Sequence, residues 1–248
     1  MSEARAAAIT RDIMDAFARI VEKHNLTQDE YRAGVVFLAE AADKGEAMLL
    51  PDALFEHAVV KYHSDRQKGT HGQVLGPYHV PDSPRLDAGR LAGEDEPGVR
   101  LEVEGRVLDT VGQALAGAEL DFWQANAEGF YSNFDAGTKP GNLRGRIRSA
   151  DNGAFRLETV VPAAYAIPHD GPTGRLLEIL GRHPWRPAHI HLIASHEGHR
   201  TLTTQIYFEG DPYLDSDSVR AARPELAFPL VDAEGGKRVE FDIVLEPT

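Results

Sequence analysis

The 248-residue chain contains no cysteine, which excludes disulfide bonds and thiolate metal sites. A bound metal would have to use histidine, tyrosine, carboxylate or water ligands. The chain also lacks the run of about 18 apolar residues that a membrane-spanning helix requires. Its first residues do not join a basic stretch to an apolar one, so no secretory signal is expected. These absences favour a cytoplasmic protein that does not enter a membrane.

Positive charge is scarce relative to negative charge. The chain has 26 lysines and arginines against 39 aspartates and glutamates, and its formal net charge is −13. This excess argues against binding to nucleic acid or to an anionic membrane surface. Apolar residues make up 42% of the chain, which is enough for a sizeable core. We therefore expect one large globular domain with at most a small appendage.

The first part of the chain has a helical pattern. Apolar residues at three- and four-residue spacing predict helices over residues 4–23 and 27–44. Thr27, followed three residues later by Glu30, is typical of a capping box at the start of the second helix. A third helix is expected after Pro51. No strand pattern occurs in this region.

The rest of the chain combines a loop with a series of strands. Residues 66–97 are rich in proline, glycine, aspartate and histidine, which indicates a loop. Alternating apolar runs then cover residues 99–107, 118–124, 143–148, 154–161, 188–194, 201–208 and 238–245. Strands without helices between them predict a mainly β fold, an antiparallel β-sandwich with a short N-terminal helical region. We divide the chain into a helical region (1–65), a linker and pocket loop (66–97) and a β-sandwich domain (98–248).

Two histidines one residue apart interrupt the strand at 188–194. Side chains alternate along a strand, so His189 and His191 share one face, and Ile190 and Leu192 share the other. Two imidazoles at this spacing can close on one metal ion. An exposed strand with two solvated histidines would show the same pattern, and the spacing alone leaves both interpretations open.

Two tyrosines upstream bear on the choice. Tyr131 follows a strand in a glycine-containing, aromatic-rich turn, and Tyr165 lies between two prolines. Taken singly, each is typical of a tyrosine packed in a core or loop. Together with the histidines, they form an oxygen-and-nitrogen donor set that suits a highly charged ion such as Fe(III). Such a cation would favour the ionised phenolate over the phenol.

Several segments carry a resemblance to a known family. They are LGPYHV (75–80), GFYSNFD (129–135), PAAYAIP (162–168), GRHPWRPAHIH (181–191) and HRTLTTQIYFEGDPY (199–213). In these segments the chain resembles the intradiol ring-cleaving dioxygenases, non-haem Fe(III) enzymes that split catechols between the two hydroxyl-bearing carbons. With the N-terminal helices included, the resemblance spans nearly the whole chain. A non-catalytic β-sandwich that binds a ligand or a structural metal is the alternative from another class.

The resemblance implies a role for each matched residue. The four iron ligands would be Tyr131, Tyr165, His189 and His191. Tyr165 would leave the iron when substrate binds and accept a proton. Arg186 and Gln205 match residues beside the substrate ring, where the arginine could steady developing negative charge. From the sequence alone, a surface salt bridge is the alternative for Arg186.

The resemblance also implies the reaction and the partners. Fe(III) would activate a bound catechol toward O2, and the ring would open to a muconate- or maleylacetate-type diacid during aromatic degradation. No organic cofactor is needed. The family pairs two protomers through N-terminal helices, which implies a homodimer. The stripe of Ile9, Ile13, Phe17 and Ile20 fits such an interface, and it fits packing on the chain's own sandwich equally well.

The substrate-binding residues follow from the same resemblance. The candidates are Leu49, Asp52, Val74, Leu75, Gly76, Pro77, Tyr78, Ile167 and Pro168. Asp52 matches an acid of the hydroxyquinol 1,2-dioxygenases, and its carboxylate could accept a hydrogen bond from an additional ring hydroxyl. Asp52 could instead cap the third helix. Hydroxyquinol is therefore the expected substrate, and catechol or an alkyl- or halo-catechol is the alternative.

Overall fold

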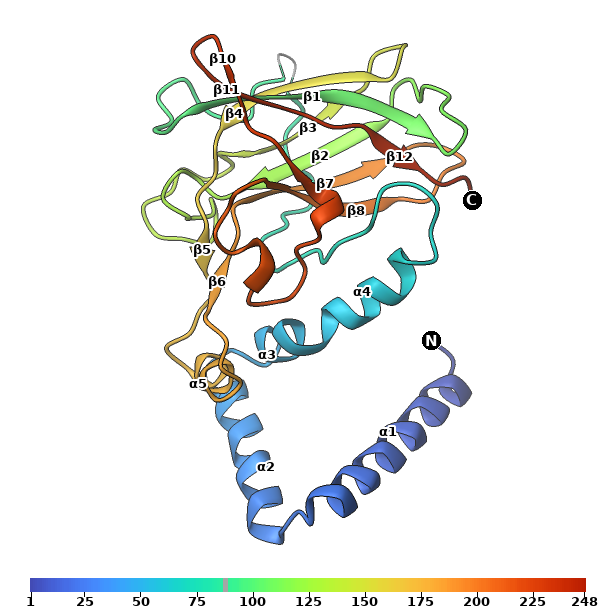
Figure 1. The fold of residues 1–248 in the computed structure, drawn as a ribbon, viewed down its shortest axis with the longest axis vertical. Coiled ribbons are helices and arrows are strands. Elements are labelled where there is room, and N and C mark those ends of the chain that lie inside the picture. The colour runs from blue at the N-terminus through green and yellow to red at the C-terminus, as the bar shows by residue number, and fades with distance from the viewer. Residues whose placement is uncertain (87–88) are drawn as a thin grey trace. The chain divides into compact units, whose positions relative to one another are not determined.

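The computed structural model describes residues 1–86 and 89–248, and the chain forms two compact units, Met1–Ala47 and Met48–Thr248 (Figure 1). The first unit contains helices α1 (Glu3–His24) and α2 (Gln28–Asp43). The expected capping box is confirmed, because Thr27 and Glu30 each accept a hydrogen bond from the other's backbone N–H. No residue of α1 is buried.

The second unit begins with a helical segment of three parts. They are α3 (Leu49–Pro51), a π-helical turn, Asp52–Glu56, and α4 (His57–Ser64). The third helix therefore starts before Asp52, and the suggestion that this residue caps it is wrong. Pro51 lies in the first helical turn, where its missing N–H costs no intrahelical bond. Asp52 has helical backbone angles of −63° and −45°.

The second unit contains two five-stranded sheets (Figure 1). One contains β3 (Arg144–Arg148), β2 (Glu119–Gln124), β7 (His189–Ser195), β8 (Leu202–Phe208) and β9 (Ala227–Phe228), in that order. The other contains β10 (Val231–Ala233), β11 (Gly236–Glu240), β1 (Arg100–Asp109) and β12 (Ile243–Leu245), with β4 (Ala154–Val160) also paired to β1. Side chains from both sheets form the main apolar core, which confirms the sandwich.

The sheets are mixed, whereas a purely antiparallel sandwich was expected. β1 runs parallel to β11 and β12, and β8 runs parallel to β9. The run expected at 238–245 is divided at Asp242, whose carboxylate accepts hydrogen bonds from the backbone and the side chain of Arg106. β1 consequently pairs with β11 along its first half and with β12 along its second.

The sequence pattern missed several short elements. The strands β5 (Tyr165–Ala166) and β6 (Trp185–Arg186) pair with each other, and helix α5 (Pro172–Ile179) lies between them in sequence. The expectation of no helix between strands was therefore wrong at this point. Within 1–86 and 89–248, no helix has the length and apolar character needed to cross a membrane.

Candidate metal and substrate site

The register of the first sheet determines how the two histidines are arranged. His191 lies opposite Trp123 of β2 and opposite Gln205 of β8, and His189 lies opposite Tyr207. Residues opposite one another share a sheet face. Ile190 and Leu192 belong to the core between the sheets, so the histidines point away from the core, which confirms the expected division of faces.

The structure brings the four candidate ligands into one buried centre. The Nε2 atoms of His189 and His191 are 3.1 Å apart, and the Tyr131 hydroxyl lies 3.4 Å from His189 Nε2. The Tyr165 ring centroid is 5.3 Å from that of Tyr131 and 5.6 Å from that of His189. All four side chains are buried. Solvated histidines on an exposed strand are thereby excluded.

The donor atoms suit a metal ion. His189 Nδ1 lies 2.7 Å from the Pro187 carbonyl, which can only accept, so this nitrogen carries the proton and Nε2 carries the lone pair. Two imidazole nitrogens bound to one ion at about 2.1 Å and at right angles would be about 3.0 Å apart. The observed 3.1 Å matches this arrangement. Among residues 1–86 and 89–248, no group of three histidine, cysteine or acidic side chains could hold a metal. A metal at this centre would therefore have to use tyrosine oxygens in addition to the two imidazoles.

Burial determines the charge state of these groups without a cation. It lowers the pKa of His189 to about 3, with a smaller contribution from the charge of Arg186, and it lowers the pKa of His191 well below its ordinary value. Burial, together with Tyr165, raises the pKa of Tyr131 well above its ordinary value. Without a cation, the centre therefore contains neutral imidazoles and a neutral Tyr131 phenol. A bound cation would favour the phenolate.

Tyr131 reaches the centre from a tight turn. Its backbone N–H donates to the Asp135 carboxylate at 2.7 Å, and its carbonyl accepts from Asp135 N–H. Gly129 precedes it with φ of +90°, and a Cβ there would lie 3.0 Å from the Tyr165 Cβ. Glycine at this position therefore allows the two tyrosine-bearing segments to approach each other.

Arg144 of β3 connects the Tyr131 turn to the pocket loop. Its guanidinium donates to the hydroxyl and carbonyl of Ser132 at 2.8 and 2.7 Å, and to the Tyr78 carbonyl at 2.9 Å. The side chain is buried, with only 2% of the residue exposed. Tyr78 in turn stacks on Tyr131, with ring centroids 4.2 Å apart.

Replacing Arg144 with methionine is expected to lower the free energy of unfolding by about 2–3 kcal/mol, because the carbonyls of Ser132 and Tyr78 lose their donor. Urea unfolding measures the loss. Arg148→Met is the matched control on the same strand, where the side chain is 57% exposed and pairs with Glu119 only at 3.7 Å. That control should change stability by less than about 0.5 kcal/mol. Equal losses in the two variants would contradict the role of Arg144.

Arg186 lies opposite Tyr165 in the β5–β6 pair and is buried, with 3% of the residue exposed. It donates to Asp217 at 3.1 Å and to the Gln205 side-chain oxygen at 2.9 Å, and its NH1 lies 3.2 Å from His189 Nε2. Burial opposes the charge of Arg186, but Asp217 and the neighbouring tyrosines raise its pKa well above the ordinary value. The surface salt bridge considered for Arg186 is therefore excluded.

Gln205 links this arginine to the pocket loop. Its side-chain oxygen accepts from Arg186 and, at 2.7 Å, from the Tyr207 hydroxyl, and its amide nitrogen donates to the Val74 carbonyl at 2.7 Å. The side-chain oxygen and one of the two amide hydrogens are thus engaged by protein atoms. Gln205 therefore connects Arg186 to the Val74 backbone of the pocket loop.

The candidate pocket residues fall into three groups. Leu49, Tyr78 and Ile167 join the apolar cluster that contains Tyr131 and Tyr165. Gly76 has φ of +71°, and a Cβ there would lie 3.3 Å from the His191 ring, so the loop passes directly over this histidine. The side chain of Val74 is buried, whereas Leu75, Pro77 and Pro168 are exposed.

Asp52 and Glu56 lie one helical turn apart and are both half-buried. Burial raises the pKa of Asp52. The pKa of Glu56 is raised mainly by burial and, to a smaller extent, by the negative charge of Asp52. The positive charge of Arg186 acts in the opposite direction and lowers it. The π-helical turn therefore presents an acidic pair near the centre, and π-helical turns are frequent at functional sites.

Sequence reasoning missed several residues of the site. Asp217 lies 31 residues from Arg186, and no local pattern indicated it. Tyr207 could have been found, since it follows Gln205 at the two-residue strand repeat. Trp123 stacks on His191, with ring centroids 4.6 Å apart and planes at 10°, and only the register of β2 against β7 reveals this contact.

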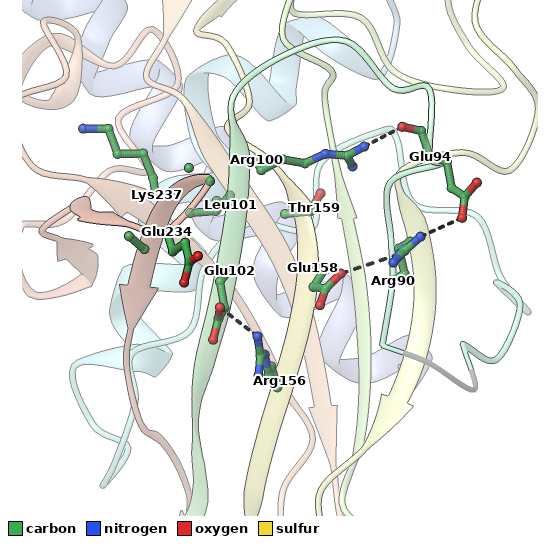
Figure 2. Close-up of a pocket in the computed structure, with 13 residues that line it drawn as sticks. Arg90, Glu94, Arg100, Leu101, Glu102, Arg156, Glu158, Thr159, Glu234 and Lys237 are labelled. Carbon is green, nitrogen blue, oxygen red and sulfur yellow. Dashed lines mark hydrogen bonds and ion pairs between the residues drawn. The ribbon is translucent and has the colours of Figure 1, made fainter.

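A separate cleft of about 480 Å³ lies over β1, β4 and β11 of the other sheet (Figure 2). Its charged side chains pair with one another: Arg90 contacts Glu94 and Glu158, and Arg156 contacts Glu102. These pairs leave no concentration of one charge to attract a ligand. None of the candidate ligands or pocket residues lines this cleft.

Comparison with known proteins identifies the class. Residues 3–71 match the family model described as "Catechol dioxygenase N terminus", and residues 74–247 match "Dioxygenase". A chlorocatechol 1,2-dioxygenase of Rhodococcus opacus is 36% identical and covers 99% of both chains. A hydroxyquinol 1,2-dioxygenase of Rhizobium sp. is 37% identical over 94% of this chain and 81% of that protein. The crystal structure of chlorocatechol 1,2-dioxygenase from Pseudomonas putida superposes with a TM-score of 0.94 at 34% identity, covering 99% of this chain and 100% of that one.

The fold and these matches define a ring-cleaving dioxygenase. More narrowly, the chain belongs to the intradiol dioxygenase family, and it is an intradiol ring-cleavage oxidoreductase. This membership favours the enzyme over the non-catalytic metal- or ligand-binding sandwich.

Proposed function

We propose that the protein is an Fe(III) enzyme that cleaves the ring of hydroxyquinol with O2. The observation that carries the iron proposal is the buried set of Tyr131, Tyr165, His189 and His191, with two imidazole nitrogens 3.1 Å apart. A ferric ion held there would withdraw electron density from a bound catecholate and make its ring reactive toward O2.

The surrounding side chains would then handle charge and protons. Tyr165, beside Arg186 in the β5–β6 pair, would accept a substrate proton on its phenolate oxygen. Arg186 would stabilise negative charge as it develops on the ring, because it is a buried cation held next to His189. Trp123 and Gly76 pack against His191 and would hold its ring in one orientation.

Asp52 supports hydroxyquinol over other catechols. Its helix begins three residues earlier, so the carboxylate is not used as a helix cap. Partial burial beside Leu49 and Glu56 disfavours an unpaired charge, and a third ring hydroxyl would give Asp52 a hydrogen-bond donor. Relatives named for chlorocatechol and for hydroxyquinol are similarly distant, so catechol or a substituted catechol is the second candidate.

Replacing Asp52 with alanine is expected to lower kcat/KM for hydroxyquinol by about 10–100-fold, which corresponds to one hydrogen bond to a charged group. Activity on catechol and 4-methylcatechol should change by less than about threefold. Kinetics with the three substrates measure the difference. Asp52→Asn retains an acceptor oxygen, so its loss of kcat/KM for hydroxyquinol should be smaller than that of Asp52→Ala. A wild-type preference for catechol, or an equal loss on all three substrates, would contradict hydroxyquinol specificity.

We also propose a homodimer formed through the first helical unit. Along α1, the side chains of Ile13, Phe17 and Ile20 are 63%, 43% and 49% exposed and share one helix face. An exposed apolar stripe of this kind favours association with a second copy.

Replacing both Ile13 and Phe17 with glutamate is expected to convert the dimer to a monomer. The measured mass should fall from twice the chain mass to the chain mass of 27.2 kDa. Sedimentation or light scattering measures the mass. Arg11→Glu adds a glutamate to the opposite face of the same helix and should leave the dimer intact. A monomeric wild-type protein would reject the dimer, and dissociation by Arg11→Glu would place the interface elsewhere.

A further inference from the structure

A second group of metal-binding atoms lies at the turn between β7 and β8. The turn contains His196, Glu197, Gly198 and His199, in the order His-Glu-Gly-His. The Nδ1 atoms of His196 and His199 are 3.2 Å apart. Each of them also approaches the Glu197 carbonyl oxygen, at 2.9 Å for His196 and 3.1 Å for His199. Three potential donor atoms thus form a nearly equilateral triangle.

This triangle has the dimensions of one face of an octahedral metal site. For a cation at about 2.2 Å from all three atoms, each donor–metal–donor angle would be about 90°. Imidazole nitrogen is a preferred donor for Zn²⁺, Ni²⁺ and Cu²⁺, and a carbonyl oxygen can complete the face. The turn would act as a chelate, because all three donors come from four consecutive residues.

The turn is held in place by the end of the chain. The Gly198 carbonyl accepts hydrogen bonds from the backbone and the hydroxyl of Thr248, at 3.0 and 3.2 Å. Arg200 N–H donates to the Glu246 carbonyl at 2.8 Å, and His199 forms a bridge with Pro247. Little reorganisation is therefore needed to bind an ion. Both histidines are half-buried and Glu197 is exposed, so an ion and its waters can reach the donors.

The turn is distinct from the proposed iron centre. His189 begins β7, and the turn follows the end of that strand at Ser195. Five residues separate His191 from His196, which corresponds to roughly 16 Å along a strand.

We propose that His196, His199 and the Glu197 carbonyl bind one divalent transition-metal ion of the imidazole-preferring group, in addition to the metal of the catalytic centre. The competing explanation is that both Nδ1–H groups only donate to the shared carbonyl. Substitution by asparagine separates the two, because its side-chain amide retains a donor near the Nδ1 position and lacks the nitrogen lone pair.

The test uses iron-loaded enzyme and Ni²⁺ as the probe. Isothermal titration is expected to show one Ni²⁺ site in the wild type. His196→Asn and His199→Asn should each lower the affinity for Ni²⁺ at least about tenfold. Loss of a residue that only hydrogen-bonds to a metal ligand already costs this much affinity, and loss of a ligand itself should cost no less. The double variant should lose the site. His24→Asn removes an exposed histidine from α1 and should leave Ni²⁺ binding unchanged.

Anomalous diffraction at the nickel edge locates the ion directly. A peak within bonding distance of both Nδ1 atoms and the Glu197 oxygen supports the proposal, and so does a rise in melting temperature with Ni²⁺ that the double variant lacks. Equal binding by the wild type and the double variant, or no peak at the turn, would overturn it. Because the comparison is made between variants at the turn, its outcome does not depend on the identity of the catalytic metal.

Discussion

Replacing both Tyr131 and Tyr165 with phenylalanine is expected to abolish the visible colour of the iron-loaded protein and to lower kcat/KM at least about 10³-fold. Colour in such a site arises from charge transfer between phenolate oxygen and Fe(III), and phenylalanine has no oxygen to supply. The four candidate donors include only two neutral imidazoles besides the tyrosines, so the double variant retains no anionic protein ligand. Its iron content after dialysis should fall as well.

Tyr78→Phe is the matched control for this experiment. The Tyr78 ring stacks on Tyr131 at 4.2 Å, and only its hydroxyl is removed. Burial raises the pKa of Tyr78, so this phenol stays protonated beside the centre. The control should retain colour and iron. Absorbance spectra and iron analysis on the same samples separate the outcomes. Persistence of the colour in the double variant, or its loss in Tyr78→Phe, would contradict the proposed ligand set.

The sequence was informative where a pattern is local. The two-residue strand repeat predicted that His189 and His191 share a face, and the capping box predicted the start of α2 at Thr27. Both depend only on backbone geometry over a few residues. The succession of alternating apolar runs predicted the sandwich for the same reason.

Features that depend on distant contacts escaped prediction. The parallel pairing of β1 with β11 and β12 joins segments more than a hundred residues apart. The approach of Tyr131 to Tyr165 requires the positive φ of Gly129 and the two-residue pairing of β5 with β6. Before their geometry was known, the tyrosines were grouped with the histidines only by the chemistry of their donor atoms and by the resemblance to a family.

Asp52 shows how a local rule can fail. An acidic residue after proline and before an apolar run is typical of a helix start. The helix nevertheless begins at Leu49, and Pro51 occupies its first turn. Packing of α3 within the second unit overrides the capping preference, and the carboxylate is left available for another partner.

Replacing Asp217 with asparagine is expected to lower the free energy of unfolding by about 3–5 kcal/mol. Asp217 and Arg186 form an ion pair whose side chains are only 2% and 3% exposed. The asparagine keeps the shape of the carboxylate but leaves the buried guanidinium without an opposite charge. Asp217 also accepts from the backbone N–H groups of Ala221 and Ala222, both at 2.9 Å. Urea unfolding measures the loss, and the exposed Asp215→Asn serves as the control.

The pH dependence separates loss of charge from loss of packing. Burial alone would raise the pKa of Asp217, but Arg186 and the Ala222 N–H bring it below its ordinary value. A carboxyl with a lowered folded-state pKa stabilises the fold above its unfolded pKa, near 3.9, and this stabilisation disappears as pH falls through the folded pKa. The difference between wild type and Asp217→Asn, measured without metal, should therefore be constant from pH 7 to 5 and shrink below about pH 4. A difference that persists at low pH would indicate a packing defect.

Catalysis then shows whether the pair does more than stabilise the fold. In Asp217→Asn, Arg186 keeps its charge but loses the carboxylate that orients it beside His189. A displaced Arg186 guanidinium would stabilise the negative charge that develops on the substrate less well. We therefore expect kcat to fall by about 10²-fold while iron content is retained. Arg186→Lys should behave similarly, because a lysine cannot reproduce the forked contacts to Asp217 and Gln205. Wild-type kcat in a destabilised Asp217→Asn would make Asp217 a structural residue only, and loss of iron would mean that the pair acts through the metal ligands.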